Sequence, residues 1–237
     1  MDSLKSVYTF ILDLIFPQFC VTCGREGNVW CEMCRAHVEC ASAPLCPVCF
    51  MRMPGNVHAS HRARTELTKL IAATTYDAVR APLHLYKYQF VQIASEPLST
   101  LFIKTLTPIL AIALTESHSR RGSWIIIPIP LHKRRKAWRG FNHAELLGEK
   151  ISTHFNIPML QALTRTRYTT PQVELKGEDR EENMRDAFSL SKNHKSIKGK
   201  IVFLIDDVYT SGATMNEAAK VLRSSGAREV WGIVLAH

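Results

Sequence analysis

The amino-acid sequence predicts an α/β protein, with a mostly parallel sheet covered by helices on both faces and a small metal-binding domain before it. Two observations support this prediction. From residue 65 onward, apolar β-branched runs alternate with helix-forming segments, as in chains that build parallel sheets. Before that point, all seven cysteines fall between residues 20 and 49, mostly in C-x-x-C pairs. We therefore expect residues 1–64 to form one domain and residues 65–237 another.

The composition favours a globular protein with anionic partners. At 237 residues the chain can bury a substantial core, and 46% hydrophobic with 22% charged residues is an ordinary balance. The net charge of +9 and the pI of about 9.3 suit phosphates and nucleic acid equally well. No apolar run is long enough to span a membrane, and the N-terminus lacks the features of a signal peptide. We therefore expect a cytoplasmic protein.

The N-terminal residues 3–16 are expected to form an amphipathic helix. Val7, Ile11, Leu14 and Ile15 would share one face of it. This face could dock on the body of the protein, or it could bind a partner or a membrane surface. The second alternative would place the protein peripherally at the inner membrane.

The cysteine pairs predict two structural zinc sites. A C-x-x-C turn directs two thiolates at one metal ion, and a reducing cytoplasm disfavours disulfides. The first two pairs complete one ribbon. The third pair can complete a second ribbon only with the downstream H-x-x-H. Alternatively, these two histidines are solvated loop residues that bind no metal. The predicted ligands are Cys20, Cys23, Cys31 and Cys34 at the first site and Cys46, Cys49, His58 and His61 at the second. Cys40 fits neither site and is expected to be a buried or inert thiol.

The strands and helices of the larger domain are expected to alternate along the chain. The expected strands are 70–76, 124–129, 201–206 and 230–235, and the expected helices are 82–90, 97–116, 142–155 and 215–224. Ligands of such open sheets bind at the carboxyl ends of the strands, so the residues that follow each strand are candidates for the site.

The most informative segment follows the strand Ile201–Ile205. Asp206 and Asp207 come directly after it, where carboxylates suit ribose hydroxyls and Mg²⁺. A hydroxyl-rich turn then opens a helix, and backbone N–H groups at a helix N-terminus suit a phosphate. The residues of this loop are Thr210, Ser211, Gly212, Ala213 and Thr214. Together these features predict a site for a phosphorylated sugar.

Two further segments are candidate parts of the same site. PIPLHKRRKAWRGFNHAELL follows the strand at 124–129 and holds five positive charges at Lys133, Arg134, Arg135, Lys136 and Arg139. Such residues could bind a polyanion or form a solvated basic turn. The segment Arg165–Arg185 is long, polar and expected to lack secondary structure, so it is either a functional loop or a solvated linker.

The segment IVFLIDDVYTSGAT resembles the phosphoribosyl-pyrophosphate signature of type I phosphoribosyltransferases. Over nearly the full length, the order of motifs is similar to that of the ComF family, whose members are competence-associated and phosphoribosyltransferase-like with an N-terminal double zinc ribbon. The matching positions are Pro128 to Pro130, Arg139 to Asn142, Arg165 to Arg167, Gln172, Arg180, Asn183 and Asp206 to Thr214. ComF members usually carry a fourth cysteine pair where this sequence has His58 and His61.

The resemblance implies an enzyme that binds phosphoribosyl pyrophosphate with Mg²⁺. Asp206, Asp207 and Arg139 are then the expected catalytic residues, and the segment Arg165–Arg185 is expected to close over the reaction. Besides the loop Thr210–Thr214, the expected phosphate-binding residues are Arg134, Asn142, Arg165 and Arg180.

The resemblance also implies a role in natural transformation, in which single-stranded DNA enters with the help of a competence helicase and an inner-membrane channel. The alternative is a non-catalytic module that binds single-stranded DNA with the zinc ribbon and the basic loops. The acceptor of a transferase reaction is not encoded in any motif of the sequence.

Overall fold

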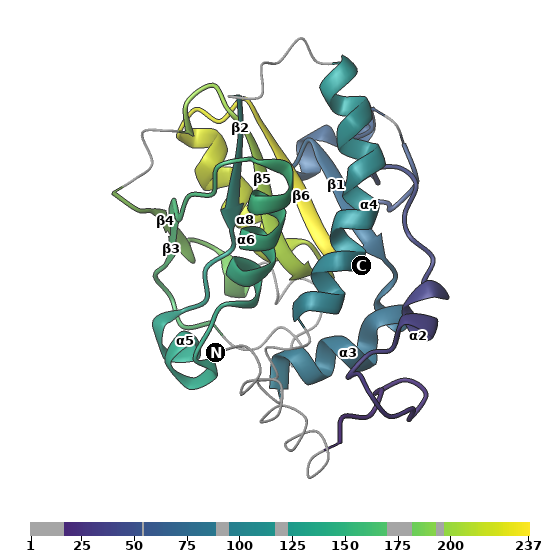
Figure 1. The fold of residues 1–237 in the computed structure, drawn as a ribbon. Helices are drawn as coiled ribbons and strands as arrows, with labels where there is room; N and C mark the ends of the chain where they lie inside the picture. Colours follow the sequence, from purple (N-terminus) through teal and green to yellow (C-terminus); the bar gives the residue numbers. More distant parts are fainter. Residues whose placement is uncertain (1–16, 54, 89–94, 117–122, 170–181, 193–196) are drawn as a thin grey trace.

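A computed structural model gives the fold of residues 17–53, 55–88, 95–116, 123–169, 182–192 and 197–237 (Figure 1). The helix expected over residues 3–16 lies outside these ranges. At the centre is a parallel four-stranded sheet with the strand order β1-β6-β5-β2. Its strands are β1 (Lys69–Thr74), β2 (Trp124–Pro128), β5 (Ile201–Val208) and β6 (Glu229–Ala236). The predicted parallel sheet is therefore confirmed.

Helices cover both faces of this sheet, as predicted. One face packs against α3 (Tyr76–Tyr88), α4 (Ser95–Glu116) and α6 (His143–Phe155), and the other against α8 (Ala213–Ser224) (Figure 1). Side chains alternate along a strand, so Phe203 of β5 joins the first core and Leu204 the second. Helix α3 begins six residues before the predicted start at 82, because Pro82 lies inside the helix rather than in its first turn.

A small antiparallel ribbon lies beside the sheet and was missed by the sequence prediction. Strand β3 (Leu163–Arg165) pairs with β4 (Phe188–Leu190), with Leu163 opposite Leu190. The polar segment that follows Arg165 therefore leaves from one strand and returns to another. Strands of three residues are too short to show an alternating pattern in sequence.

The cysteine-rich segment is attached to the free edge of β1. The backbone groups of Leu45 and Leu70 exchange hydrogen bonds of 2.7 and 3.2 Å, and the N–H of Ala41 donates to the carbonyl of Ala73 at 2.9 Å. Two short helices lie in this segment, α2 (Glu32–Ala36) and the 3-10 helix η1 (Ala59–Arg64). The main chain of the metal-binding region thus extends the hydrogen bonding of the sheet.

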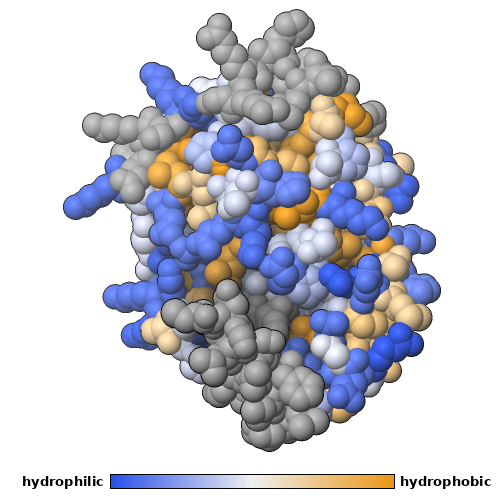
Figure 2. Space-filling model, viewed as in Figure 1, coloured by the Kyte–Doolittle hydropathy of each residue, from blue (hydrophilic) through white to orange (hydrophobic). Residues whose placement is uncertain are grey.

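The basic segment after β2 forms a short helix, α5 (Lys133–Arg139), where either an anion-binding loop or a solvated turn was expected. Gly140 ends α5 in the left-handed conformation, with φ of +78°, and allows the chain to reverse into α6. On the face shown in Figure 2, hydrophilic side chains cover much of the surface and apolar ones form separate patches. No helix in the described ranges has the length and apolar content needed to cross a membrane.

Candidate functional site

The two acids lie where the sequence placed them, at the carboxyl end of the central strand β5. Asp206 and Asp207 are both half-buried, and the Asp206 carboxylate accepts a hydrogen bond of 2.9 Å from the Asp207 backbone N–H. Asp206 lines a small hollow together with Thr210, Gly212 and Thr214. The acids and the following loop therefore border one space.

The loop after the acids leads directly into α8. Gly212 is the N-cap of the helix and has φ of +78°, a conformation that favours glycine. A β-carbon at this position would also overlap the hydroxyl of Tyr209, so the glycine is required by the packing as well. The side chains of Thr210 and Ser211 are exposed. The helix N-terminus and these hydroxyls together form a surface suited to a phosphate.

The Tyr209 side chain packs against this loop and forms a hydrogen bond with the metal-binding region. The buried Tyr209 hydroxyl donates a hydrogen bond of 2.9 Å to the carbonyl of Pro47, between Cys46 and Cys49. Its ring also meets the ring of Phe50 edge-on at 5.8 Å. Burial raises the pKa of Tyr209 well above its ordinary value, so the hydroxyl stays protonated and remains a donor.

Helix α5 brings positive charge towards the same end of the sheet. Lys133 and Arg134 are exposed, whereas Lys136 forms an ion pair of 3.1 Å with Glu145. The Arg135 guanidinium donates to the carbonyl of Thr169 at 2.8 Å, which fixes α5 to the segment after β3. Of the cations in this helix, Lys133 and Arg134 are thus the ones most available to a ligand.

The exposed ring of Tyr168 lies against basic residues at the start of this helix. It lies 5.5 and 5.7 Å from the guanidinium carbons of Arg134 and Arg135, and 5.2 Å from the ring of His132. Burial and the charges of Lys133 and Arg134 lower the pKa of His132. The imidazole is therefore neutral at pH 7, and its Nδ1 accepts a hydrogen bond of 3.3 Å from the Arg134 N–H.

Arg165 connects the basic helix with the acids. Burial and the nearby Arg135 together lower its pKa to about 10, although Asp206 acts in the opposite direction. Its guanidinium donates to the Thr169 hydroxyl and lies 3.3 Å from the Met184 sulfur. Arg165 remains protonated at pH 7, so it adds a cation between the acid pair and α5.

The other predicted phosphate ligands have different surroundings. Asn142 is buried as the N-cap of α6: its Oδ1 accepts from the Ala144 N–H at 3.2 Å and its Nδ2 donates to the Ile129 carbonyl at 3.0 Å. It therefore holds the turn after α5 against the end of β2. Arg139 is half-buried at the end of α5. Arg180 and Gln172 lie outside the described residues.

Both predicted ligand sets come together in the metal-binding region. In each set, the four ligand atoms lie within 4.8 Å of one another. Tetrahedral zinc separates two sulfurs by about 3.8 Å, and a sulfur from a nitrogen by about 3.6 Å. The sulfurs of Cys23 and Cys31 are 3.7 Å apart, and the Cys46 sulfur lies 3.4 Å from the His61 nitrogen. Cys49 and His58 are 3.5 Å apart in the same way.

Two of the six ligand thiols, Cys20 and Cys46, have a lowered pKa, which favours the thiolate that binds metal, whereas the Cys23 side chain raises the pKa of Cys34. Burial would raise the pKa of Cys46, but the N–H groups of Cys49 and Val48 and the side chain of His61 bring it down to about 6. The N–H groups of Cys31, Cys23 and Thr22 likewise outweigh burial and lower the pKa of Cys20 to about 6. Both clusters therefore fit structural zinc, which binds thiolate rather than thiol.

Several residues around the site were not predicted from the sequence. These are Tyr168, Trp138, Tyr209 and Arg64, of which Trp138 is 63% exposed on α5. The position of Trp138 among basic residues was a usable signal, because exposed aromatic rings beside cations are common in sites for nucleotides. The contact of Tyr209 with Pro47 joins residues 162 positions apart and leaves no such signal.

Comparison with known proteins agrees with this architecture. Residues 142–237 match the family model described as phosphoribosyl transferase domain, and residues 11–63 match the double zinc ribbon domain. "Competence protein F" of Haemophilus influenzae is 30% identical over 226 residues, which cover 88% of this chain and 98% of that protein. The chain belongs to the ComF family.

Other ComF relatives match over similar lengths. "DNA utilization protein YhgH" of Escherichia coli O6:H1 is 28% identical, with 90% of this chain and 86% of that protein covered. "Competence protein ComFC" of Bacillus subtilis is 27% identical, with 83% and 78% covered. A solved structure of "the allosteric regulatory enzyme of purine biosynthesis" aligns at 19% identity with a TM-score of 0.35, over 58% of this chain and 24% of that chain. The two family models confirm the phosphoribosyltransferase-like fold with an N-terminal double zinc ribbon.

Proposed function

We propose that this ComF protein binds phosphoribosyl pyrophosphate with Mg²⁺ and transfers its phosphoribosyl group. The observation that supports this most is the placement of Asp206 and Asp207 at the end of β5, next to the loop that opens α8. Acids beside a phosphate loop would repel an anion unless they face hydroxyls or a cation. A ribose diol and Mg²⁺ meet that requirement together.

Each part of the ligand has a candidate partner. Asp206 and Asp207 would hold the ribose diol and share in Mg²⁺ binding, and the loop Thr210–Thr214 would hold the 5′-phosphate. Arg134, Arg139 and Arg165 would receive the pyrophosphate, with Arg180 as a further candidate. The bound Mg²⁺ would neutralise charge that develops on the departing pyrophosphate.

Such a reaction needs no nucleophile from the protein. As the bond to pyrophosphate breaks, positive charge develops on the sugar and negative charge on the leaving group. The half-buried carboxylates would stabilise the positive charge on the sugar. The cations of α5 and Arg165 would stabilise the negative charge on the leaving pyrophosphate. The segment between β3 and β4 is proposed to close over the site and exclude water, which would otherwise capture the sugar.

The names of the relatives support a proposal for the cellular role. Proteins named for competence and for DNA utilization match most of the chain, so we propose a role in natural transformation and DNA uptake. A competence helicase and an inner-membrane channel are the proposed partners. Both zinc ions would be structural, because each cluster supplies four protein ligands and leaves no position open for substrate.

Calorimetry with phosphoribosyl pyrophosphate and Mg²⁺ tests the ligand. Asp206→Asn with Asp207→Asn should weaken binding by about 1.4–3 kcal/mol, the scale of lost charge-assisted bonds. Asp77→Asn with Glu66→Gln removes the same charge from two exposed acids and should leave affinity unchanged. Equal affinity of the wild type and the Asp206/Asp207 variant would show that these acids face something else.

A second candidate function is binding of single-stranded DNA. The observation that favours it is the exposed pair Trp138 and Tyr168, 63% and 56% exposed, beside the exposed cations Lys133 and Arg134. Stacking of a base on an aromatic side chain contributes about 1–3 kcal/mol. Trp138→Ala should therefore weaken binding of an oligothymidylate at low salt, whereas Tyr76→Ala, at an exposed ring on α3, should not. No binding by the wild-type protein even at low salt would exclude this function.

A further inference from the structure

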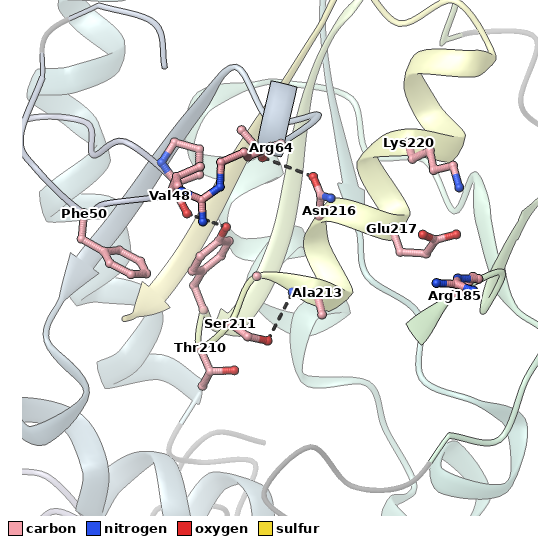
Figure 3. Close-up of a pocket in the computed structure, with 14 residues that line it drawn as sticks. Val48, Phe50, Arg64, Arg185, Thr210, Ser211, Ala213, Asn216, Glu217 and Lys220 are labelled. Carbon is pink, nitrogen blue, oxygen red and sulfur yellow. Dashed lines mark hydrogen bonds between the residues drawn. The ribbon is translucent and has the colours of Figure 1, made fainter. Parts of the chain in front are cut away.

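A second cavity lies on the other side of the phosphate loop from the acids. Its volume is about 470 Å³, and neither Asp206 nor Asp207 lines it. Its walls come from the segment 47–50, the end of η1 at Arg64 and Thr65, the loop and first turns of α8, and Arg185 (Figure 3). The metal-binding region and the larger domain therefore build this cavity jointly.

The cavity has an excess of positive charge. Arg64, Arg185 and Lys220 line it, against the single carboxylate of Glu217. Glu217 already accepts a hydrogen bond of 3.0 Å from the Asp186 N–H, and Arg185 forms an exposed ion pair of 2.8 Å with Glu182. Among the described residues, no carboxylate lies within 4.0 Å of a nitrogen of Arg64 or Lys220. These two cations are therefore available to an anionic ligand.

The two cations belong to different walls. In Figure 3, Arg64 lies on the side of Val48, whereas Lys220 lies on the far side, next to Glu217 and Arg185. A ligand with two linked phosphates offers one anionic group to each of these sides, which a single phosphate does not.

The wall that carries Arg64 is held in place before any ligand binds. The side-chain oxygen of Asn216 on α8 accepts hydrogen bonds from the Glu66 N–H at 2.7 Å and the Thr65 hydroxyl at 3.2 Å. These bonds fasten the chain directly after Arg64 to the helix that carries Lys220. Because this geometry is preformed, less conformational freedom is lost on binding.

The same wall offers an apolar surface. Val48 is half-buried, and the ring of Phe50 is 37% exposed. The Phe50 ring is fixed on one side by the ring of His237, at 5.3 Å and 12°, and at its edge by Tyr209. A fixed, partly exposed ring that lines the same cavity as Arg64 is suited to pack against a nucleobase.

We propose that this cavity is a second ligand site that binds a nucleoside diphosphate, with its base against Val48 and Phe50 and its phosphates between Arg64 and Lys220. A cavity of this size lies within the ordinary range for small organic ligands. The site goes beyond the proposed phosphoribosyl pyrophosphate site, because the acids take no part in it. The two sites share the loop Thr210–Ala213 as a wall but no charged side chain, so we expect both ligands to bind at once.

Calorimetry with ADP tests this site. Arg64→Ser with Lys220→Ser should raise the Kd of ADP at least about tenfold, because two charged contacts are lost. The matched control is Arg62→Ser with Lys104→Ser, which removes two exposed cations, one of them from the same 3-10 helix. The control should bind ADP like the wild type. Zinc content and circular dichroism confirm that each variant is folded.

Three further measurements test whether the site prefers a diphosphate and is separate from the phosphoribosyl pyrophosphate site. AMP should bind more weakly than ADP, and ADP should still bind when phosphoribosyl pyrophosphate is saturating or when Asp206 and Asp207 are both replaced by Asn. The proposal is overturned if ADP does not bind, if the Arg64/Lys220 variant binds it normally, or if phosphoribosyl pyrophosphate displaces it. It is also overturned if an oligothymidylate, and not ADP, depends on Arg64 and Lys220. Failure of phosphoribosyl pyrophosphate to bind would contradict the proposed function and leave the ADP result standing.

Discussion

Replacing Tyr209 by Phe tests whether the second metal cluster supports the phosphate loop. The substitution removes one hydroxyl and keeps the ring that packs under Gly212 and against Phe50. The lost hydrogen bond to Pro47 is neutral and buried, and bonds of this kind contribute about 0.5–1.5 kcal/mol. The Pro47 carbonyl also loses its hydroxyl partner, and an unsatisfied buried group costs about 1–3 kcal/mol. We therefore expect the free energy of unfolding to fall by about 1–2 kcal/mol.

The informative assay follows zinc and ligand together. In Tyr209→Phe, a chelator should remove zinc faster from the cluster of Cys46, Cys49, His58 and His61, and phosphoribosyl pyrophosphate should bind more weakly. Denaturant unfolding measures the loss of stability at the same time. Tyr76→Phe is the matched control, because its ring is 42% exposed on α3 and removal of its hydroxyl should change neither zinc release, ligand affinity nor stability. If Tyr209→Phe releases zinc and unfolds like the wild type, the contact with Pro47 does not couple the two regions.

Three more predictions follow from the site. Elemental analysis should find two zinc ions per chain, and His58→Ala with His61→Ala should leave one; an unchanged content would mean that these histidines bind no metal. Gly212→Ala should weaken binding of phosphoribosyl pyrophosphate, because the added methyl group overlaps Tyr209 and φ is +78°; wild-type affinity in calorimetry would contradict this. Arg165→Met should weaken that binding while the free energy of unfolding stays equal or rises, because burial penalises the cation. The folded pKa of Arg165, about 10, lies below its ordinary value of 12.5. The free energy of unfolding of the wild type should therefore rise as the pH increases from about 10 towards 12.5. Unfolding experiments at alkaline pH should show that Arg165→Met lacks this rise.

The parts of the fold that were predictable are those encoded in contiguous residues. The run Ile201–Ile205 with its two acids and following loop contains a strand, a turn and a helix start within one short segment, and the C-x-x-C spacing is equally local. The pairing of Leu45 with Leu70 and the bond from Tyr209 to Pro47 depend instead on how distant segments pack. Helix α5 was missed because its residues were interpreted by their charge, although Lys, Arg and Ala are also good helix formers.

The cavity beside α8 was missed because its residues are distant in sequence. Arg64, Lys220 and Phe50 are far apart in the chain, and each is unremarkable in its own surroundings. Only their convergence on one hollow gives them a shared role. The second ligand site is therefore a property of the packing between the two regions and has no motif of its own.

The strand order has a consequence for the way the chain folds during synthesis. Strand β6 follows the other sheet strands in the chain, yet it lies between β1 and β5. Until β6 has left the ribosome, β1 and β5 lack the strand that pairs with both of them, so the four-stranded sheet cannot form. The ligands of both metal clusters are close in sequence and are made first, so they can bind zinc while the sheet is still open. A nascent chain would thus carry a finished metal-binding region attached to an unfinished sheet, and its unpaired strand edges would be prone to aggregation until β6 is inserted.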